Sequence, residues 1–276
     1  MRFTKMQGCG NDYVYVDCFS ETVDDPAALA RVIADRHFGV GGDGLILICP
    51  SDTADARMRM YNADGSEGVM CGNGIRCVAK YIYDHGIVPP ERRSAVIDTN
   101  DGPKTVELTV EEGKAVLVTV DMGTLSLTSE PCEPITVDGM DLFFTGVDAG
   151  NPHAVYFLED NPALGVSDVR ELDFDRYGRA FETHPRFPDR VNSEFVSRRS
   201  PREIDFRVWE RGSGETLACG TGATAAVYAG IRLGKLDNEV LVHLRGGDLR
   251  IRFAPAAGHC FMTGPAAEVF TGDYPV

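Results

Sequence analysis

The most constraining feature of this 276-residue chain is a short motif that occurs twice. Each copy is a cysteine followed by Gly-x-Gly and a run of small or apolar residues, at Cys71-Gly72-Asn73-Gly74 and at Cys219-Gly220-Thr221-Gly222. The copies are 148 residues apart, and the same offset aligns three further pairs: Arg59 with Arg207, Tyr61 with Trp209, and Glu67 with Glu215. A repeat that occurs once per half-chain predicts two duplicated domains rather than a short-period solenoid.

A cysteine at the start of a helix lies beside free backbone N–H groups and the positive end of the helix dipole. Both favour an anion there, including a thiolate. A single cysteine of this kind is commonly a buried structural residue, but two in like domains could act on one carbon. One thiolate would remove a proton from one face, and the other thiol would return a proton to the opposite face. The helix N-termini would stabilise the carbanion through its carboxylate. The pattern therefore predicts inversion of a stereocentre without a cofactor.

Composition narrows the class of protein. The formal net charge of −15 argues against nucleic acid or an acidic membrane surface as a partner. No apolar run approaches the ~20 residues of a membrane helix, and the N-terminal residues do not lead into a signal-peptide core, so we expect a cytoplasmic protein. Eight cysteines without a CxxC pair predict neither a disulfide framework nor a structural zinc site, and Cys77 is interpreted as a core residue.

Local patterns predict strands alternating with a few helices. Helices are expected over about 26–35, 73–85 and 223–233, the second stopped by Gly86. Strands are expected at 2–6, 12–18, 45–49, 57–61, 95–99, 104–110, 114–121, 192–197, 204–210 and 266–270, with one running to Leu158 and two flanking the turn at 245–248. Residues 122–134 are rich in Ser, Thr and Pro and are interpreted as the domain boundary. Residues 160–191 show no clear pattern.

Taken together, these motifs resemble the diaminopimelate epimerases, which are cofactor-independent amino-acid epimerases of lysine biosynthesis. The resemblance covers nearly the whole chain. It rests on the two cysteine motifs and on Gly10-Asn11-Asp12-Tyr13, Asn62-Ala63-Asp64-Gly65-Ser66-Glu67, Gly150-Asn151-Pro152-His153, Arg190-Val191-Asn192 and Glu210-Arg211-Gly212-Ser213-Gly214-Glu215-Thr216. The joint order and spacing of these motifs are far more specific than any one of them.

The resemblance implies roles for individual residues. Cys71 and Cys219 would be the catalytic acid/base pair that interconverts L,L- and meso-diaminopimelate. The amides of Gly72, Asn73, Gly220 and Thr221 would hold the reacting carboxylate. Asn11, Asn62, Asn151, Asn192, Glu210 and Arg211 would bind the substrate, mostly at its distal end, and His153 and Glu210 would tune the two thiols. No cofactor or metal is implied, and the partner is a small zwitterionic substrate.

The family fold is α/β (α+β), with two pseudo-symmetric domains, each a mixed barrel-like sheet around a central helix. Here the domains would be residues 1–122 with 263–276, carrying Cys71, and residues 123–262, carrying Cys219. The family also implies a homodimer, with Phe270 where relatives often have a contact tyrosine. Some relatives carry glutamine where this chain has Gly44, so Asp43, water or nothing is expected to fill that role.

Two alternatives remain open at this point. A proline racemase or hydroxyproline epimerase of the same fold also uses paired cysteines, but a ring substrate would favour apolar lining where Glu210 and Arg211 stand. A protein of a different class would use Cys71 and Cys219 as a reversible redox dithiol. A thiol titration with activity followed in parallel distinguishes an epimerase from a redox dithiol protein, since reductant should switch an epimerase on.

Overall fold

A computed structural model describes residues 1–275. The chain divides into two compact units. Unit 1 is Met1–Asp121 with Thr263–Val276, and unit 2 is Met122–Met262. No helix among the described residues is long and apolar enough to cross a membrane.

Unit 1 contains the N-terminal strands, two helices and the C-terminal strand. Its elements are β1 (Arg2–Gly8), β2 (Asn11–Asp17), α1 (Pro26–Ile33), β3 (Gly44–Cys49), β4 (Ala56–Asn62), β5 (Glu67–Gly68), α2 (Gly72–Asp84), β6 (Ser94–Thr99), β7 (Gly102–Glu111), β8 (Lys114–Thr124) and β19 (Ala267–Asp273). The last residues of β8 lie in unit 2, because this strand continues across the boundary.

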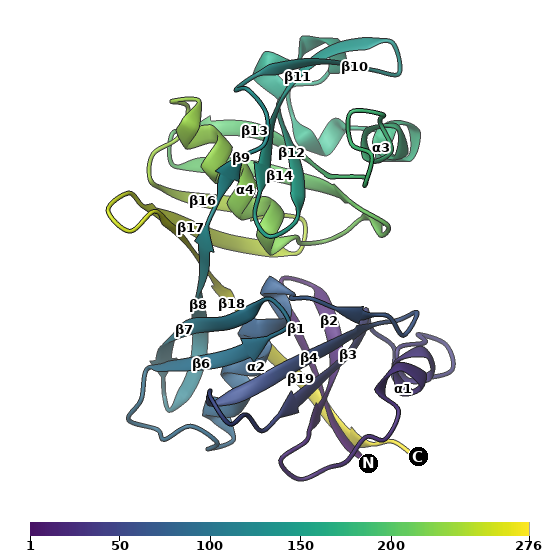
Figure 1. Cartoon of the computed structure of the whole chain (residues 1–276), viewed down its shortest axis with the longest axis vertical. Helices are drawn as coiled ribbons and strands as arrows, with labels where there is room; N and C mark the ends of the chain where they lie inside the picture. Colours follow the sequence, from purple (N-terminus) through teal and green to yellow (C-terminus); the bar gives the residue numbers. More distant parts are fainter. Residues whose placement is uncertain (276) are drawn as a thin grey trace. The chain divides into compact units, whose positions relative to one another are not determined.

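The strands of unit 1 form one mixed sheet that curves around α2 (Figure 1). Its order is β8-β7-β6-β4-β3-β2-β1-β19, and the pairs β2–β3 and β4–β6 are parallel while the others are antiparallel. In Figure 1 the yellow C-terminal strand lies beside the purple β1. Eleven of the 13 residues of α2 are buried, and only Lys80 and Asp84 are not. The helix is therefore the centre of the unit.

Unit 2 repeats this arrangement. Its elements are β9 (Ser126–Leu127), β10 (Glu133–Val137), β11 (Met140–Asp148), β12 (Pro152–Phe157), three short 3-10 turns at 158–160, 162–164 and 169–171, α3 (Phe174–Glu182), β13 (Asn192–Ser200), β14 (Glu203–Glu210), β15 (Gly214–Glu215), α4 (Gly220–Arg232), β16 (Glu239–Leu244), β17 (Gly247–Ala254) and β18 (His259–Pro265). β18 continues past the boundary into unit 1.

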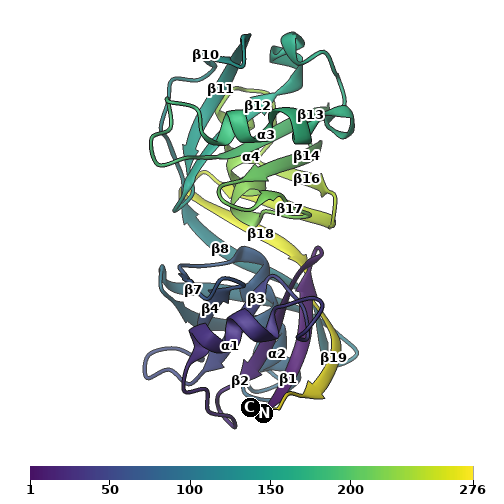
Figure 2. The same ribbon diagram turned by 90° about the vertical axis from the view of Figure 1, so that its right-hand side faces the viewer.

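The sheet of unit 2 has the same pattern of pairings. Its order is β17-β16-β14-β13-β12-β11, with β12–β13 and β14–β16 parallel. Helix α4 packs on β11, β12, β13 and β17 of this sheet and is buried along most of its length (Figure 2). An offset of 148 residues relates both ends of α2 to both ends of α4, and it relates the first residues of α1 and β3 to those of α3 and β13. The predicted duplication and mixed α/β fold are confirmed.

The structure differs from the sequence-based expectation in a few elements. Helices α2 and α4 begin earlier than predicted, at Gly72 and Gly220, because each cysteine side chain itself caps the helix. Helix α3 and strand β18 were not predicted. The α3 sequence contains Gly178, which is a poor helix former, but any Cβ there would lie 2.1 Å from Trp209 Cε3, so packing against the indole requires glycine. Residues 122–134 are not irregular throughout, since β8 extends to Thr124.

Candidate functional site

In unit 1, Cys71 is the N-cap residue of α2. Its Sγ accepts a hydrogen bond from the backbone N–H of Gly74 at 3.3 Å, so sulfur takes the place that an Asn, Asp or Ser oxygen usually occupies. The thiol also donates a hydrogen bond to Oδ1 of Asn11, the first residue of β2, at 3.3 Å. The helix N-terminus and an amide side chain therefore both fix the position of this sulfur.

Asn11 is itself held by a carboxylate. Its Nδ2 donates to Oδ2 of Asp43 at 2.6 Å, and the same oxygen accepts the backbone N–H of Asp12. Asp43 Oδ1 in turn pairs with Arg36 at 2.9 Å. Because the amide N–H is committed to Asp43, the amide oxygen of Asn11 is turned toward Cys71. Asp43 therefore orients Asn11.

Two other predicted residues of unit 1 lie near the start of α2. Asn73 is in the first turn and is buried. Asn62 ends β4, and its Nδ2 donates to Ser66 Oγ at 2.9 Å within the loop that leads to Cys71.

Gly44 begins β3, where a Cβ would lie 2.0 Å from the carbonyl oxygen of Tyr61, so this backbone leaves no room for a glutamine side chain.

In unit 2, Cys219 is the N-cap residue of α4 and is buried. Its Sγ accepts from the backbone N–H of Gly222 at 3.3 Å and lies 3.5 Å from Thr221 Oγ1. Burial raises the pKa of this thiol well above its usual value, and the charges of Glu210 and Glu194 raise it further, against the opposing hydrogen bonds of Thr221 and Gly222. The thiol form of Cys219 is therefore favoured at neutral pH.

A buried polar chain lies behind Cys219. The ring of His153 joins Glu194 Oε1 through Nδ1 at 2.7 Å and Asn151 Oδ1 through Nε2 at 2.8 Å, and the side chains of His153 and Glu194 are both fully buried. An amide oxygen can only accept, so Nε2 carries a proton. The Nδ1–Glu194 contact then shares one proton between imidazole and carboxyl. Burial raises the pKa of Glu194, while the nearby His153 opposes that rise.

Glycine is required at the third position of both helices. A Cβ on Gly222 would lie 2.8 Å from Glu194 Oε1 and 3.2 Å from Cys219 Sγ. A Cβ on Gly74 would lie 2.6 Å from Ile46 Cδ1 and 3.5 Å from Cys71 Sγ. Each glycine therefore allows a side chain of the neighbouring strand to approach the helix end beside the thiol.

The remaining predicted residues of unit 2 surround the ends of β13 and β14. Asn192 Nδ2 donates to the carbonyl of Pro152 at 3.0 Å, and its Oδ1 accepts the backbone N–H of Arg211 at 2.9 Å. Glu210 Oε1 accepts from Thr216 Oγ1. Arg211 reaches the carbonyl of Asp189 and is otherwise exposed. Asn192 thus joins the starts of β12 and β13 to the end of β14, and it keeps only part of its hydrogen-bonding capacity for a ligand.

Glu194 is the residue that sequence reasoning missed. The repeat contains the signal: with the offset of 148, Glu194 aligns with Ile46, so one half places a carboxylate where the other has an apolar core residue. Both residues are fully buried in the equivalent strands β13 and β3. An acidic residue in a buried strand position calls for a partner, and here the partner is His153.

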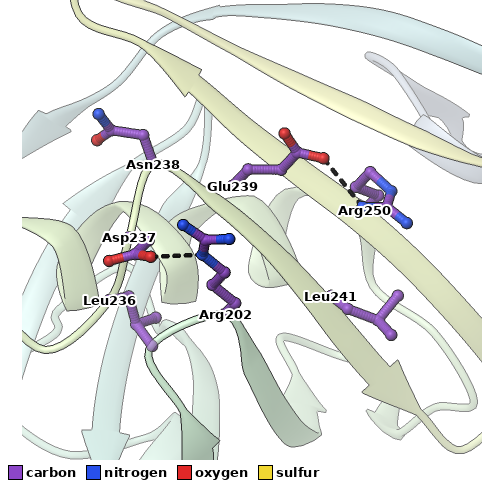
Figure 3. Close-up of a pocket in the computed structure, with 7 residues that line it drawn as sticks. All are labelled: Arg202, Leu236, Asp237, Asn238, Glu239, Leu241 and Arg250. Carbon is purple, nitrogen blue, oxygen red and sulfur yellow. Dashed lines mark hydrogen bonds and ion pairs between the residues drawn. The ribbon is translucent and has the colours of Figure 1, made fainter.

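A pocket in unit 2 is formed by β16, β17, the loop before β16 and the residue before β14, and it contains none of the predicted site residues (Figure 3). It is lined by Arg202, Leu236, Asp237, Asn238, Glu239, Leu241 and Arg250. Its charges pair with one another, Arg202 with Asp237 at 2.7 Å and Arg250 with Glu239 at 2.9 Å. Within residues 1–275, no cluster of three or more His, Cys, Asp or Glu side chains is arranged to hold a metal ion.

Comparison with known proteins identifies the family. The model of the family described as diaminopimelate epimerase matches residues 3–128 and 145–269. A diaminopimelate epimerase of Agathobacter rectalis is 51% identical over 291 residues, covering 99% of both chains. One from Desulfovibrio desulfuricans is 49% identical, covering 99% of this chain and 98% of the relative.

The chain belongs to the diaminopimelate epimerase family. Epimerases are isomerases, so this is an isomerase family, as the resemblance predicted. Among solved structures, a probable proline racemase from Agrobacterium radiobacter superimposes with a TM-score of 0.75 at 16% identity, covering 100% of this chain and 93% of that one. At that identity the likeness shows a shared fold.

Proposed function

We propose that this chain interconverts L,L- and meso-diaminopimelate by proton transfer at Cα, with Cys71 and Cys219 as the two acid/base residues. The observation that carries this proposal is the repeated helix start, in which each cysteine Sγ accepts the N–H of the third helical residue at 3.3 Å. Two thiols in equivalent backbone settings suit a reaction that treats the two faces of one carbon alike.

In one direction of the reaction, the Cys71 thiolate takes the proton from Cα, and the Cys219 thiol gives its proton to the opposite face. After this turnover Cys71 is a thiol and Cys219 a thiolate, and the reverse direction starts from that state. The raised pKa of Cys219 supports its assignment as the donor when Cys71 acts as the base.

The negative charge that develops on the substrate carboxylate is assigned to the helix N-termini. The first N–H groups of a helix have no carbonyl partner in the helix, and the dipole adds a partial positive charge. In this proposal the amides of Gly72 and Asn73 and those of Gly220 and Thr221 bind the carboxylate. Such fixed donors cost no reorganisation as charge appears, which makes them effective in a carbanion reaction.

The remaining candidate residues are assigned to recognition of the substrate. Asn11, which contacts Cys71, and Asn151, which contacts His153, are assigned to substrate binding. Asn62, Asn192, Glu210 and Arg211 would bind the distal amino-acid group. Such a group needs an acceptor for its ammonium and a cation for its carboxylate, and Glu210 and Arg211 supply one of each. His153 and Glu210 are assigned to tuning the thiols.

Assembly and location are also proposals. The chain would act in the cytoplasm, in lysine biosynthesis, as a homodimer. Phe270 on β19 is half-exposed, packs edge-on against Phe3 at a centroid distance of 6.0 Å, and adjoins the exposed Val269. An apolar pair on an outer strand suits contact with a second copy. Light scattering should show a dimer for the wild-type chain. For Phe270→Ser it should show a smaller fraction of dimer at the same protein concentration.

The substrate assignment is tested by assaying the reduced enzyme with L,L-diaminopimelate, L-proline and trans-4-hydroxy-L-proline. Inversion of diaminopimelate alone is expected. Inversion of a proline substrate without diaminopimelate would refute the substrate and favour a proline racemase activity. Absence of turnover with every substrate under reducing conditions would favour a redox role for the two cysteines.

A further inference from the structure

Two cysteines outside the candidate site lie side by side in unit 1. Cys18 follows the last residue of β2, and Cys49 is the last residue of β3. These strands are parallel, so both thiols lie at the same edge of the sheet. Asn11, which contacts Cys71, is at the opposite end of β2, roughly 20 Å away along an extended strand.

The register brings the two cysteines directly opposite one another. Asp17 pairs with Ile48, and the N–H of Cys18 donates to the carbonyl of Ile48 at 2.9 Å, which continues the ladder by one residue. Both cysteines pack against the same core cluster as Val16 and Leu47, so their side chains share one face. Neighbouring strands are about 5 Å apart, within the Cα separations that a disulfide spans.

The two thiols interact unequally. A hydrogen bond from Cys18 and the charges of Arg59 and Arg57 on the adjacent β4 together lower the pKa of Cys49 to about 7, while burial opposes them. The same interaction raises the pKa of Cys18, as do burial and the charge of Asp17. Cys49 therefore carries a large thiolate fraction near neutral pH, and Cys18 keeps its proton. Both side chains are only partly buried, so small reagents can reach them.

We propose that Cys18 and Cys49 form a modification site in which a hydroperoxide oxidises the two thiols to an intrachain disulfide. The Cys49 thiolate attacks the peroxide, an S–O bond forms, the O–O bond breaks, and the leaving alkoxide or hydroxide takes up a proton. Cys18 sulfur then attacks Cys49 sulfur and displaces the oxygen as water, which carries away the Cys18 proton. In total two thiols and one peroxide give one disulfide, one alcohol or water, and one further water.

The other cysteines do not share this arrangement. Cys132 is partly buried, and burial raises its pKa, with the charge of Asp160 adding to the rise. Cys9, Cys77 and Cys260 are buried. Cys132 is therefore a matched control, because it has similar access but a thiol with a raised pKa.

Peptide mapping tests the proposal. The reduced full-length protein is treated with hydrogen peroxide, quenched with catalase, alkylated, and cleaved before aspartate residues. This cleavage separates residues 17–23, which contain Cys18 alone, from residues 43–51, which contain Cys49 alone. We expect the two peptides joined with the loss of two hydrogens, the joined species reverting on reduction, and no such species from Cys18→Ser or Cys49→Ser.

Three results would overturn the proposal: Cys49 oxidised to sulfinic acid while Cys18 remains alkylated, no oxidation at either residue, or a different partner joined to Cys49. A second measurement checks the thiolate in the wild-type protein and needs no variant. At pH 7 and without peroxide, iodoacetamide should label Cys49 roughly tenfold or more faster than Cys132. Equal rates would contradict the nucleophile assignment.

Discussion

The starts of α2 and α4 share a backbone but differ in what lies behind the thiol. In unit 1, position 46 on β3 is an isoleucine and position 13 on β2 a tyrosine. In unit 2, the corresponding residues of β13 and β12 are Glu194 and His153, joined at 2.7 Å. Duplication therefore preserved the helix cap and the thiol, while one half acquired a buried ionisable pair.

This difference indicates that the two thiols have different surroundings and different preferred protonation states. Cys71 contacts the neutral amide of Asn11, whereas Cys219 has carboxylates nearby that disfavour its thiolate. A two-base inversion needs one thiolate and one thiol at the start of each turnover, and the carboxylates near Cys219 favour the thiol at that position. We regard Glu194 as a positioning residue that acts through His153 and the electrostatics of Cys219.

The largest expected effect comes from removing either sulfur. Cys71→Ala and Cys219→Ala should each lower the rate of inversion by about 10³-fold or more, because each loses a general acid/base in one half of the reaction. Cys132→Ala is the control and should retain full activity. A single variant that keeps a tenth of the wild-type rate would show that its sulfur is dispensable.

The next largest effect tests the buried pair directly. Glu194→Gln should lower kcat/KM by about 10- to 100-fold, the rate equivalent of a buried charged hydrogen bond of ~1.5–3 kcal/mol. Because the Glu194 charge raises the pKa of Cys219, its removal should shift the pH dependence of Cys219 alkylation to lower pH.

Ile46→Val is the matched control for Glu194→Gln at the equivalent position of unit 1, and it should change kcat/KM less than about threefold. An unshifted alkylation profile in Glu194→Gln, with activity lost, would mean that Glu194 only stabilises the fold.

A smaller effect is expected from Asp43, which orients Asn11 in unit 1. Asp43→Ala should lower kcat/KM by about tenfold, since the amide of Asn11 is then free to turn away from Cys71. Asp55→Asn is the control, because Asp55 is a carboxylate of the same unit that pairs with Arg92 at 2.6 Å and precedes the end of β4 opposite to Asn62. Equal activities of the two variants would remove Asp43 from the site.

The smallest effect is on stability and compares the two glycines. Gly74→Ala and Gly222→Ala should each lower the free energy of unfolding by about 1–3 kcal/mol through overpacking, which exceeds the gain of up to ~1 kcal/mol in helix propensity. Ile46→Val removes Cδ1, the atom 2.6 Å from the added methyl, so it should restore much of the stability of Gly74→Ala. Urea unfolding measures the stability of the double variant that combines Gly74→Ala with Ile46→Val. A free energy of unfolding no higher than that of Gly74→Ala alone would contradict this explanation.

Much of the similarity between the two units could be predicted from the sequence. The spacing of the two cysteine motifs predicted the duplication, the two central helices and most strands, because these depend on local patterns and on the repeat. Helix α3 was missed, since its contacts with Trp209 and Phe195 are tertiary and its own sequence is polar and contains glycine. Glu194 was missed because the repeat shows only that a carboxylate replaces Ile46, whereas its partner His153 is a tertiary contact that the sequence does not reveal.

The most direct test of the two-base assignment follows deuterium during inversion of L,L-diaminopimelate in D2O, observed by proton NMR at low conversion. We expect the meso product to carry deuterium at the inverted Cα, because its new hydrogen comes from a solvent-exchanged thiol, while unreacted L,L substrate keeps its proton. Product that retains the original proton at that carbon would show one base acting on both faces, and it would contradict the assignment of Cys71 and Cys219 to opposite faces.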